Sequence, residues 1–155
     1  MSTHFVALYL HVIGACVLLG TGAGIAFFML ISHRTRDPVL VAHVAGIVVL
    51  ADTVFTATAA VLQPLTGWIL AQNAGWPLTN GWVFWALLLY ILIGACWLPV
   101  VWIQIKMKRL AEQACDAGTA LPPEYDRLFR IWFALGIPAF GAVLAIVWLM
   151  LAKPV

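Results

Sequence analysis

The sequence predicts an all-α protein, a four-helix transmembrane bundle with both termini on the side of the membrane away from the cytoplasm. Of its 155 residues, 65% are hydrophobic and only 9% are charged, whereas soluble domains carry about 25% charged residues. Four apolar runs each reach the length of about 20 residues that crossing a bilayer requires. Nearly all lysines and arginines lie in two of the three connecting loops. We therefore expect an integral membrane protein, and the charge distribution does not favour a nucleic-acid-binding surface.

The four spans follow from these apolar runs. We expect the first at residues 5–31; it is too long for a signal-peptide core and no basic segment precedes it. The others are expected at residues 39–70, 82–105 and 131–151, with the third helix continuing beyond the membrane to Cys115. No internal repeat divides the chain, so residues 1–155 are predicted to form a single domain.

The basic residues predict the orientation of the bundle. They lie in the first loop and in or beside the third loop, at Arg34, Arg36, Lys106, Lys108, Arg109, Arg127 and Arg130, and only Lys153 lies on the opposite side. By the positive-inside rule, the first and third loops face the cytoplasm. Both termini and the second loop then face away from it.

Asp52 lies midway along the second apolar run, where a charge costs roughly 2.5–3.5 kcal/mol on insertion scales. Steps of three and four residues place Asp52 and Thr56 on one helix face together with Gln63, whereas His43 lies about 180° away. We therefore predict Asp52 and Thr56 as buried polar residues and His43 as a residue near the membrane interface. Two interpretations of Asp52 stay open: a protonated carboxyl that fixes helix register, or a site for a proton, an ion or a cofactor.

His11 shares one face of the first helix with Gly14 and other small residues, which let another helix or a flat ring approach closely. Imidazole is the commonest metal ligand in proteins. His11 is therefore a candidate metal ligand, either as an axial ligand of a b-type haem or, in the alternative interpretation, only as a hydrogen-bonded helix contact. Gly20 and Gly24 form a GxxxG pair on the opposite face, which indicates helix packing.

The segment Gln63–Trp68 contains Pro64 and Gly67 and predicts a break in the second helix near its outer end. His11 is expected at a similar depth. The sequence therefore predicts a pocket formed by His11, Gln63 and Thr66, and an ordinary helix end with a turn is the alternative.

Four segments resemble an uncharacterised bacterial family of predicted integral membrane proteins: His11 to Gly14, Asp52 to Gly67, Trp97 to Pro99 with Gln104, and Trp132 through Pro138 to Pro154. The resemblance covers nearly the whole chain. It implies a location in the bacterial inner membrane, where the positive-inside rule then predicts both termini on the periplasmic side.

The chain is more distantly similar to copper-resistance membrane proteins and to small membrane-embedded protoporphyrinogen oxidases. That similarity implies a four-helix unit with a histidine in its first helix, which His11 matches, and in the oxidase group this histidine is associated with haem b. The rest of the oxidase pattern is not matched, so oxidase activity is not implied. Met29 and Met150 are not spaced with any histidine as a copper motif would require.

We therefore expect a membrane redox-cofactor protein that binds haem b through His11 and transfers electrons, with Gly14, Gln63 and Thr66 at the cofactor. The alternative is a cofactor-free membrane subunit or small transporter with a polar site at Asp52. An enzyme would be an oxidoreductase acting on a porphyrin or a quinone, but the sequence identifies no second catalytic group. Expected partners are membrane lipid, a redox partner protein or quinone, and a second copy of the chain.

Overall fold

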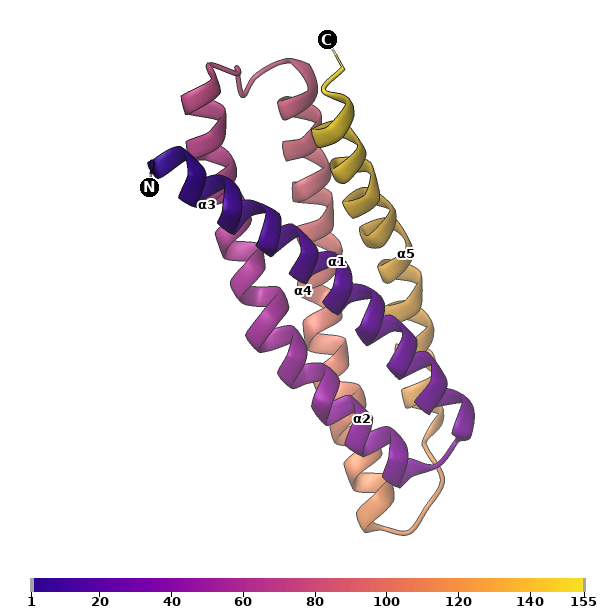
Figure 1. The fold of residues 1–155 in the computed structure, drawn as a ribbon. Coiled ribbons are helices and arrows are strands. Elements are labelled where there is room, and N and C mark those ends of the chain that lie inside the picture. The colour runs from indigo at the N-terminus through magenta and orange to yellow at the C-terminus, as the bar shows by residue number, and fades with distance from the viewer. Residues whose placement is uncertain (1, 155) are drawn as a thin grey trace.

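The computed structural model describes residues 2–154 and consists of four long helical rods (Figure 1). The elements are α1 (Thr3–Thr35), α2 (Pro38–Ala51), the π-helical segment η1 (Asp52–Thr56), α3 (Ala57–Ala74), α4 (Gly81–Asp116) and α5 (Pro123–Ala152). Because α2, η1 and α3 join without interruption, they form one rod of 37 residues. All four rods are long and apolar enough to cross a membrane, and residues 2–154 contain no strand. The predicted all-helical, four-span fold is confirmed.

Capping side chains and a glycine set several of the helix ends. The Ser2 hydroxyl caps α1 by accepting a hydrogen bond from the Phe5 backbone N–H at 3.3 Å. The Asp37 carboxylate caps α2 by accepting one from Val39 N–H at 2.9 Å, and Pro38 occupies the first helical position, where a missing N–H costs nothing. Gly75 ends α3 with φ of 69°, a left-handed conformation that glycine adopts without strain.

The predicted spans 5–31, 39–70, 82–105 and 131–151 lie inside these rods, and α4 continues to Asp116, close to the predicted Cys115. Both termini and the α3–α4 loop lie at one end of the bundle, which we call the terminal end (Figure 1). The α1–α2 and α4–α5 loops lie at the other, which we call the charged end. Which end faces the cytoplasm stays a prediction from the positive-inside rule.

The predicted break at Gln63–Trp68 is wrong, because α3 runs through Pro64 to Ala74. Proline has no N–H, so the carbonyl of Ala60, four residues earlier, loses its usual helical donor. The hydroxyl of Tyr90 on α4 donates a hydrogen bond to that carbonyl oxygen. A neighbouring helix therefore satisfies the freed backbone group, which is the condition for keeping proline inside a transmembrane helix.

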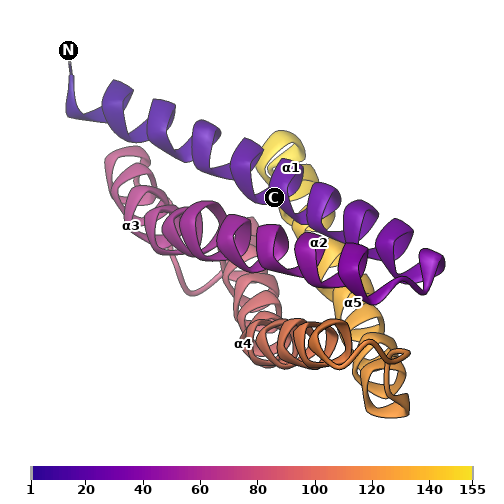
Figure 2. The same cartoon turned by 90° about the horizontal axis from the view of Figure 1, so that it is seen from below.

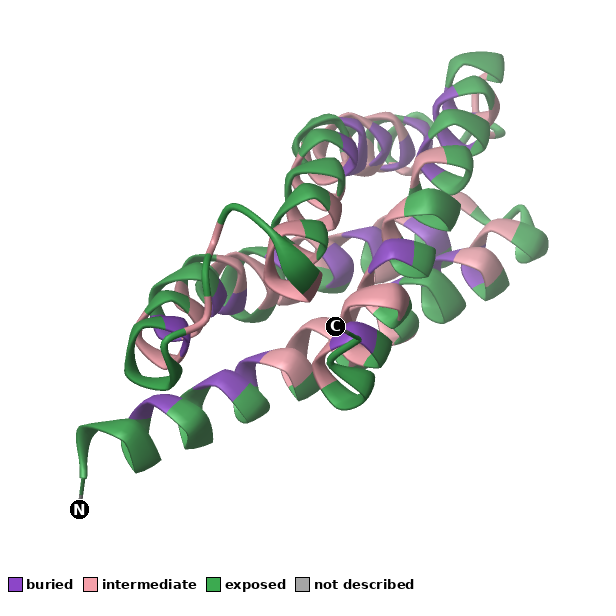
Figure 3. Ribbon diagram, turned by 90° about the horizontal axis from the view of Figure 1, so that it is seen from above, coloured by how far each residue is buried: buried purple, intermediate pink, exposed green. Residues whose placement is uncertain are grey.

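The buried apolar core lies towards the charged end. It is built from α1, α2, α4 and α5: Ile25, Met29, Val41, Ala45, Val48, Ile103, Met107, Ala111, Tyr125, Leu128, Phe129 and Trp132. Elsewhere α1 lies along the rod formed by α2, η1 and α3 (Figure 2), and α4 packs mainly on α5. Much of the outer helix surface is exposed (Figure 3) and apolar, as a surface facing lipid would be.

At the charged end, the end of α1 is tied to the start of α5. The His33 ring stacks on Phe129 with ring centroids 3.7 Å apart and an interplanar angle of 4°. Arg36 forms an ion pair with Asp126 beside this stack. Burial lowers the pKa of His33, Arg36 lowers it further, and Asp126 partly opposes them.

The substitution Tyr90→Phe tests the compensation of Pro64. It leaves the Ala60 carbonyl without a donor, so we expect the free energy of unfolding to fall by about 1 kcal/mol, measured by circular dichroism in detergent. In a Pro64→Ala background the helix regains its own N–H, and Tyr90→Phe should then cost much less. Equal losses in the two backgrounds would contradict this account.

The His33 stack predicts a pH-dependent stability. Because the pKa of His33 is lower in the folded state, the unfolded state binds more protons as the pH falls below about 6.5. The contribution of His33 to the free energy of unfolding is fully present above about pH 6.5. It is lost as the pH falls through the pKa that His33 has in the folded state. Unfolding measured across this range should show a shallower slope in His33→Phe, which keeps an aromatic ring but cannot titrate. An unchanged slope would show that other groups cause the dependence.

Candidate functional site

Asp52 lies inside the bundle with only 5% of its surface exposed, while His43 is exposed, as their angular separation predicts. Asp52 is the first residue of η1, and its carbonyl accepts a hydrogen bond from the N–H of Ala57, five residues later. Short π-helical segments inside α-helices occur frequently at functional sites. The backbone irregularity and the buried carboxyl therefore coincide.

Three side chains from two other helices complete a hydrogen-bonded network around Asp52. The indole Nε1 of Trp97 on α4 donates to both carboxylate oxygens, at 3.1 and 3.2 Å. The Gln104 amide, also on α4, satisfies both of its neighbours in one orientation: its nitrogen donates to Asp52 Oδ2 at 3.1 Å, and its oxygen accepts from Trp132 Nε1 of α5 at 3.1 Å. The opposite orientation places the amide oxygen against the carboxylate and the amide N–H₂ against the indole N–H.

The donors to Asp52 are all neutral. Within residues 2–154, the ion pairs are Arg36–Asp126, Lys106–Glu124 and Lys108–Glu112, all towards the charged end. No described cation pairs with Asp52. The network therefore supplies hydrogen bonds to the carboxylate but does not neutralise its charge.

His11 is buried between α1 and α3, where the structure brings it together with Gln63 and Thr66. Its Nδ1 lies 2.8 Å from Thr66 Oγ1, and Gln63 Nε2 donates to the His11 carbonyl oxygen at 3.0 Å. Gly14 and Gly67 permit this close approach: a Cβ at Gly14 would lie 3.1 Å from Gln63 Nε2, and one at Gly67 would lie 3.2 Å from His11 Cε1.

The Thr66 hydroxyl determines the tautomer of His11 that the geometry favours. Thr66 Oγ1 is 2.8 Å from the Leu62 carbonyl oxygen and 3.2 Å from that of Gln63, and it has one hydrogen to donate. That hydrogen goes to a backbone carbonyl, so His11 donates through Nδ1–H. The lone pair of His11 then resides on Nε2, which makes no hydrogen bond to any residue in 2–154.

Two polar atoms on the face of the rod between His11 and Asp52 have no hydrogen-bond partner in the described chain. They are the buried Thr56 Oγ1 and Gln63 Oε1; an unsatisfied buried polar group costs about 1–3 kcal/mol. The neighbouring hydroxyls of Thr53 and Thr58 are exposed on the helix surface and donate to the carbonyls of Val49 and Val54. The unpaired atoms are therefore confined to the inner face.

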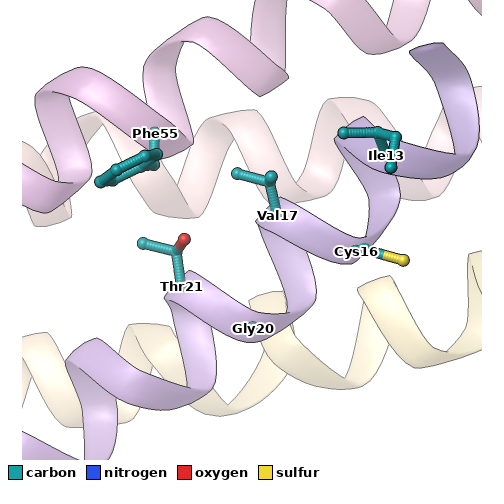
Figure 4. A pocket seen from close by; sticks show the side chains of 6 residues that line it. All are labelled: Ile13, Cys16, Val17, Gly20, Thr21 and Phe55. Atoms are coloured by element: carbon teal, nitrogen blue, oxygen red, sulfur yellow. The ribbon is translucent and has the colours of Figure 1, made fainter.

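Two hollows of the surface are lined by neither Asp52 nor His11. One of about 440 Å³ is lined by α1 and η1 (Figure 4), with Val17 and Thr21 on the side of α1 towards Phe55. Gly20 lines it, and a Cβ added at Gly20 or at Gly24 would have no neighbouring atom within 4 Å. This glycine pair contacts no other helix within the described chain, so its helix-packing role stays a prediction. Residues 2–154 also hold no group of three or more histidine, cysteine, aspartate or glutamate side chains that could bind a metal ion.

Sequence reasoning missed Trp97, Gln104 and Trp132 as partners of Asp52. Gln104 carries the signal available in the sequence, because it is an uncharged polar residue near the end of an apolar run; the structure shows it to be only 3% exposed. Tryptophans are common in membrane helices, so the two indole N–H groups gave no signal by themselves.

Comparison with known proteins adds the family of the chain. The model of a family described as predicted integral membrane protein (DUF2269) matches residues 5–154. The chain belongs to this family. Searches of curated proteins and of solved structures found no match. The family description agrees with the four spans and states no activity, and the more distant similarity to copper-resistance proteins and oxidases is not shown by these comparisons.

Proposed function

We propose that this protein is a small membrane unit that binds and releases a proton at Asp52, either as a transporter or as a subunit of a larger membrane complex. The observation that carries the proposal is the network in which Trp97 and Gln104 hold a buried carboxyl with neutral donors only. Ionisable residues within transmembrane segments commonly belong to proton or ion pathways.

The lack of a cationic partner among the described residues favours a proton as the species bound. Neutral N–H donors stabilise a carboxylate but leave its charge in a medium of low dielectric constant. A proton cancels that charge without requiring a large coordination shell. By contrast, a metal ion needs several ligands, and residues 2–154 group no three metal-ligating side chains.

Gln104 gives the site two hydrogen-bonding states. With Asp52 ionised, the amide nitrogen donates to Oδ2 and the amide oxygen accepts from Trp132. When Oδ2 carries a proton, the carboxyl becomes a donor, and an amide turned by 180° accepts from it through oxygen. The turned amide then presents N–H to the indole N–H of Trp132, so that bond is lost. Proton binding at Asp52 is thereby linked to the contact between α4 and α5.

The first test is Asp52→Asn, which keeps the shape of the side chain and removes the titratable group. Infrared difference spectra between acidic and alkaline buffers should contain a carboxylic-acid C=O band in the wild type that is absent from Asp52→Asn. Asp37→Asn is the matched control, because Asp37 caps α2 outside the predicted spans and asparagine caps equally well. A wild-type spectrum identical to that of Asp52→Asn contradicts the proposal.

A second candidate function is b-type haem binding by His11. The specific observation in its favour is the bond of Nδ1 to Thr66, which leaves Nε2 without a described partner. Metal-binding histidines generally have their second nitrogen held in this way, which fixes the ring and raises its basicity.

The residues around His11 suit a b-type haem, because His11 offers a ring nitrogen, free within the described chain, as a ligand to the iron. His11 would hold the iron through Nε2, Thr66 would orient the imidazole, and Gln63 would hold the helix backbone at His11. A haem bound there supplies one-electron transfer, with a quinone or a redox protein as the natural partner. Gln63 lies against Gly14, so Gly14 permits the close approach of α1 and α3 beside the proposed haem ligand.

An absorption spectrum tests the haem function. Protein purified from haem-replete cells should show a Soret band that is lost in His11→Ala, because that variant lacks the imidazole. His43→Ala is the control, since His43 is exposed on another helix, and its spectrum should match the wild type. A colourless wild type, or a band that survives in His11→Ala, rules out His11 as the ligand.

A further inference from the structure

We propose that the inner face of the rod formed by α2, η1 and α3 is a water-bridged proton path from the terminal end of the bundle to Asp52. This inference rests on the proposed proton-binding function of Asp52 and adds the route and the side from which the proton enters. The path runs through Thr66, Gln63 and Thr56, with His11 at its mouth.

The polar residues of the path recur along a single face of the rod. Asp52, Gln63 and Thr66 are buried, with 5%, 7% and 4% of their surfaces exposed, and Thr56 is half-buried. At a rise of about 1.5 Å per residue, Asp52 and Thr66 are roughly 20 Å apart along the axis. The face therefore covers most of the distance from the middle of the membrane to the terminal end.

The unpaired atoms identify this face as a place that binds water. Of the buried side-chain atoms without a partner in residues 2–154, only Thr56 Oγ1 and Gln63 Oε1 lie inside the predicted spans; the other two belong to His33 and Tyr125 near the charged end. Buried polar groups without a protein partner are generally satisfied by ordered water. The two candidates for such water within the predicted spans thus lie on the face between His11 and Asp52.

The interval between Thr56 and Gln63 is suited to a short file of water. Seven residues separate them, a rise of roughly 10 Å, which two or three waters span at hydrogen-bond distances near 2.8 Å. The buried residue between them is Ala59, whose small side chain obstructs little. The Tyr90 hydroxyl reaches the same level from α4, and its oxygen can still accept a hydrogen bond while it donates to Ala60.

His11 provides the mouth at the terminal end. A neutral imidazole accepts a proton at one nitrogen and releases one from the other. Nδ1–H faces Thr66, and His11 retains 9% exposed surface, so Nε2 is the atom that takes the incoming proton from water at the terminal end. As Thr66 Oγ1 takes the Nδ1 proton, its own hydrogen turns from the backbone carbonyl to a water beside Gln63 Oε1. Gln63 holds that water and does not itself carry the proton, since an amide oxygen only accepts. The waters and the Thr56 hydroxyl pass the proton on, so that one proton leaves the aqueous phase and one O–H bond forms at the Asp52 carboxylate.

The charged end is closed to this path in the structure. Beyond Asp52 the bundle is filled mainly by the apolar core, in which Val41 and Met107 have no exposed surface and Met29 has 1%. The unpaired atoms of His33 and Tyr125 lie at the far end of this core, near the charged end. A proton at Asp52 therefore exchanges with the terminal end in this conformation.

The test measures how fast Asp52 exchanges its proton. The carboxylic-acid infrared band is followed after rapid transfer of the protein from H₂O to D₂O, because the band shifts when deuterium replaces the proton. Thr56→Val and Gln63→Leu should each slow the shift at least tenfold relative to the wild type. Thr56→Val is the sharper variant, because Thr56 Oγ1 meets the geometry of no hydrogen bond in the described chain. Since this hydroxyl also lies beside the Asp52 carboxyl, the static infrared spectrum of Thr56→Val must still contain the Asp52 band before its exchange rate is compared.

Two controls separate the path from effects on folding. Thr53→Val is the same substitution one turn away on the exposed face and should leave the exchange rate unchanged, while Thr56→Ser keeps the hydroxyl and should restore it. Wild-type rates in both Thr56→Val and Gln63→Leu overturn the path while leaving proton binding at Asp52 intact. A wild type without the Asp52 band overturns the proposed function and the path together.

Discussion

The structure depends on one constraint: inside a membrane, each polar group must find its hydrogen-bond partner within the protein or in water enclosed by it. Thr53 and Thr58 meet this requirement by donating to carbonyls of their own helix, and Tyr90 meets it for the carbonyl that Pro64 leaves free. Because these neighbouring hydroxyls all have hydrogen-bond partners, the unpaired oxygens of Thr56 and Gln63 are informative. They mark a face where the protein provides polar groups but no protein partners.

The same constraint explains why Asp52 joins three rods. A carboxylate in a medium of low dielectric constant needs several donors, and no single helix carries enough of them at the required depth. Trp97 and Gln104 supply donors from α4, and the amide oxygen of Gln104 in turn accepts a hydrogen bond from the indole N–H of Trp132 on α5. The orientation of one amide is therefore set by groups on two different helices. Protonation of Asp52 therefore affects α5, because a Gln104 amide that turns to accept from the protonated carboxyl no longer accepts from Trp132.

Hydropathy and helical periodicity predicted much of the fold, because both reflect properties of single helices. The four spans follow from apolar length, and the burial of Asp52 opposite an exposed His43 follows from about 100° per residue. The break predicted at Gln63–Trp68 is wrong because the donor that preserves α3 is on another helix, 30 residues away. For the same reason the proximity of His11 and Thr66 was predictable from depth, whereas the partnership of Asp52 with Gln104 and Trp132 required the relative rotation of three helices.

The two proposed functions compete for one lone pair on His11. Because Thr66 directs its hydrogen to a backbone carbonyl, His11 donates through Nδ1, and Nε2 is left to accept either a proton or iron. Iron at Nε2 blocks protonation there, so a haem ligand cannot also receive protons at the mouth of the path. The polar face from Gln63 to Asp52 has no evident purpose for a haem held at His11 alone, whereas a proton path uses every one of its groups. The distribution of unpaired atoms along α3 and η1 therefore favours the proton as the species that this protein handles.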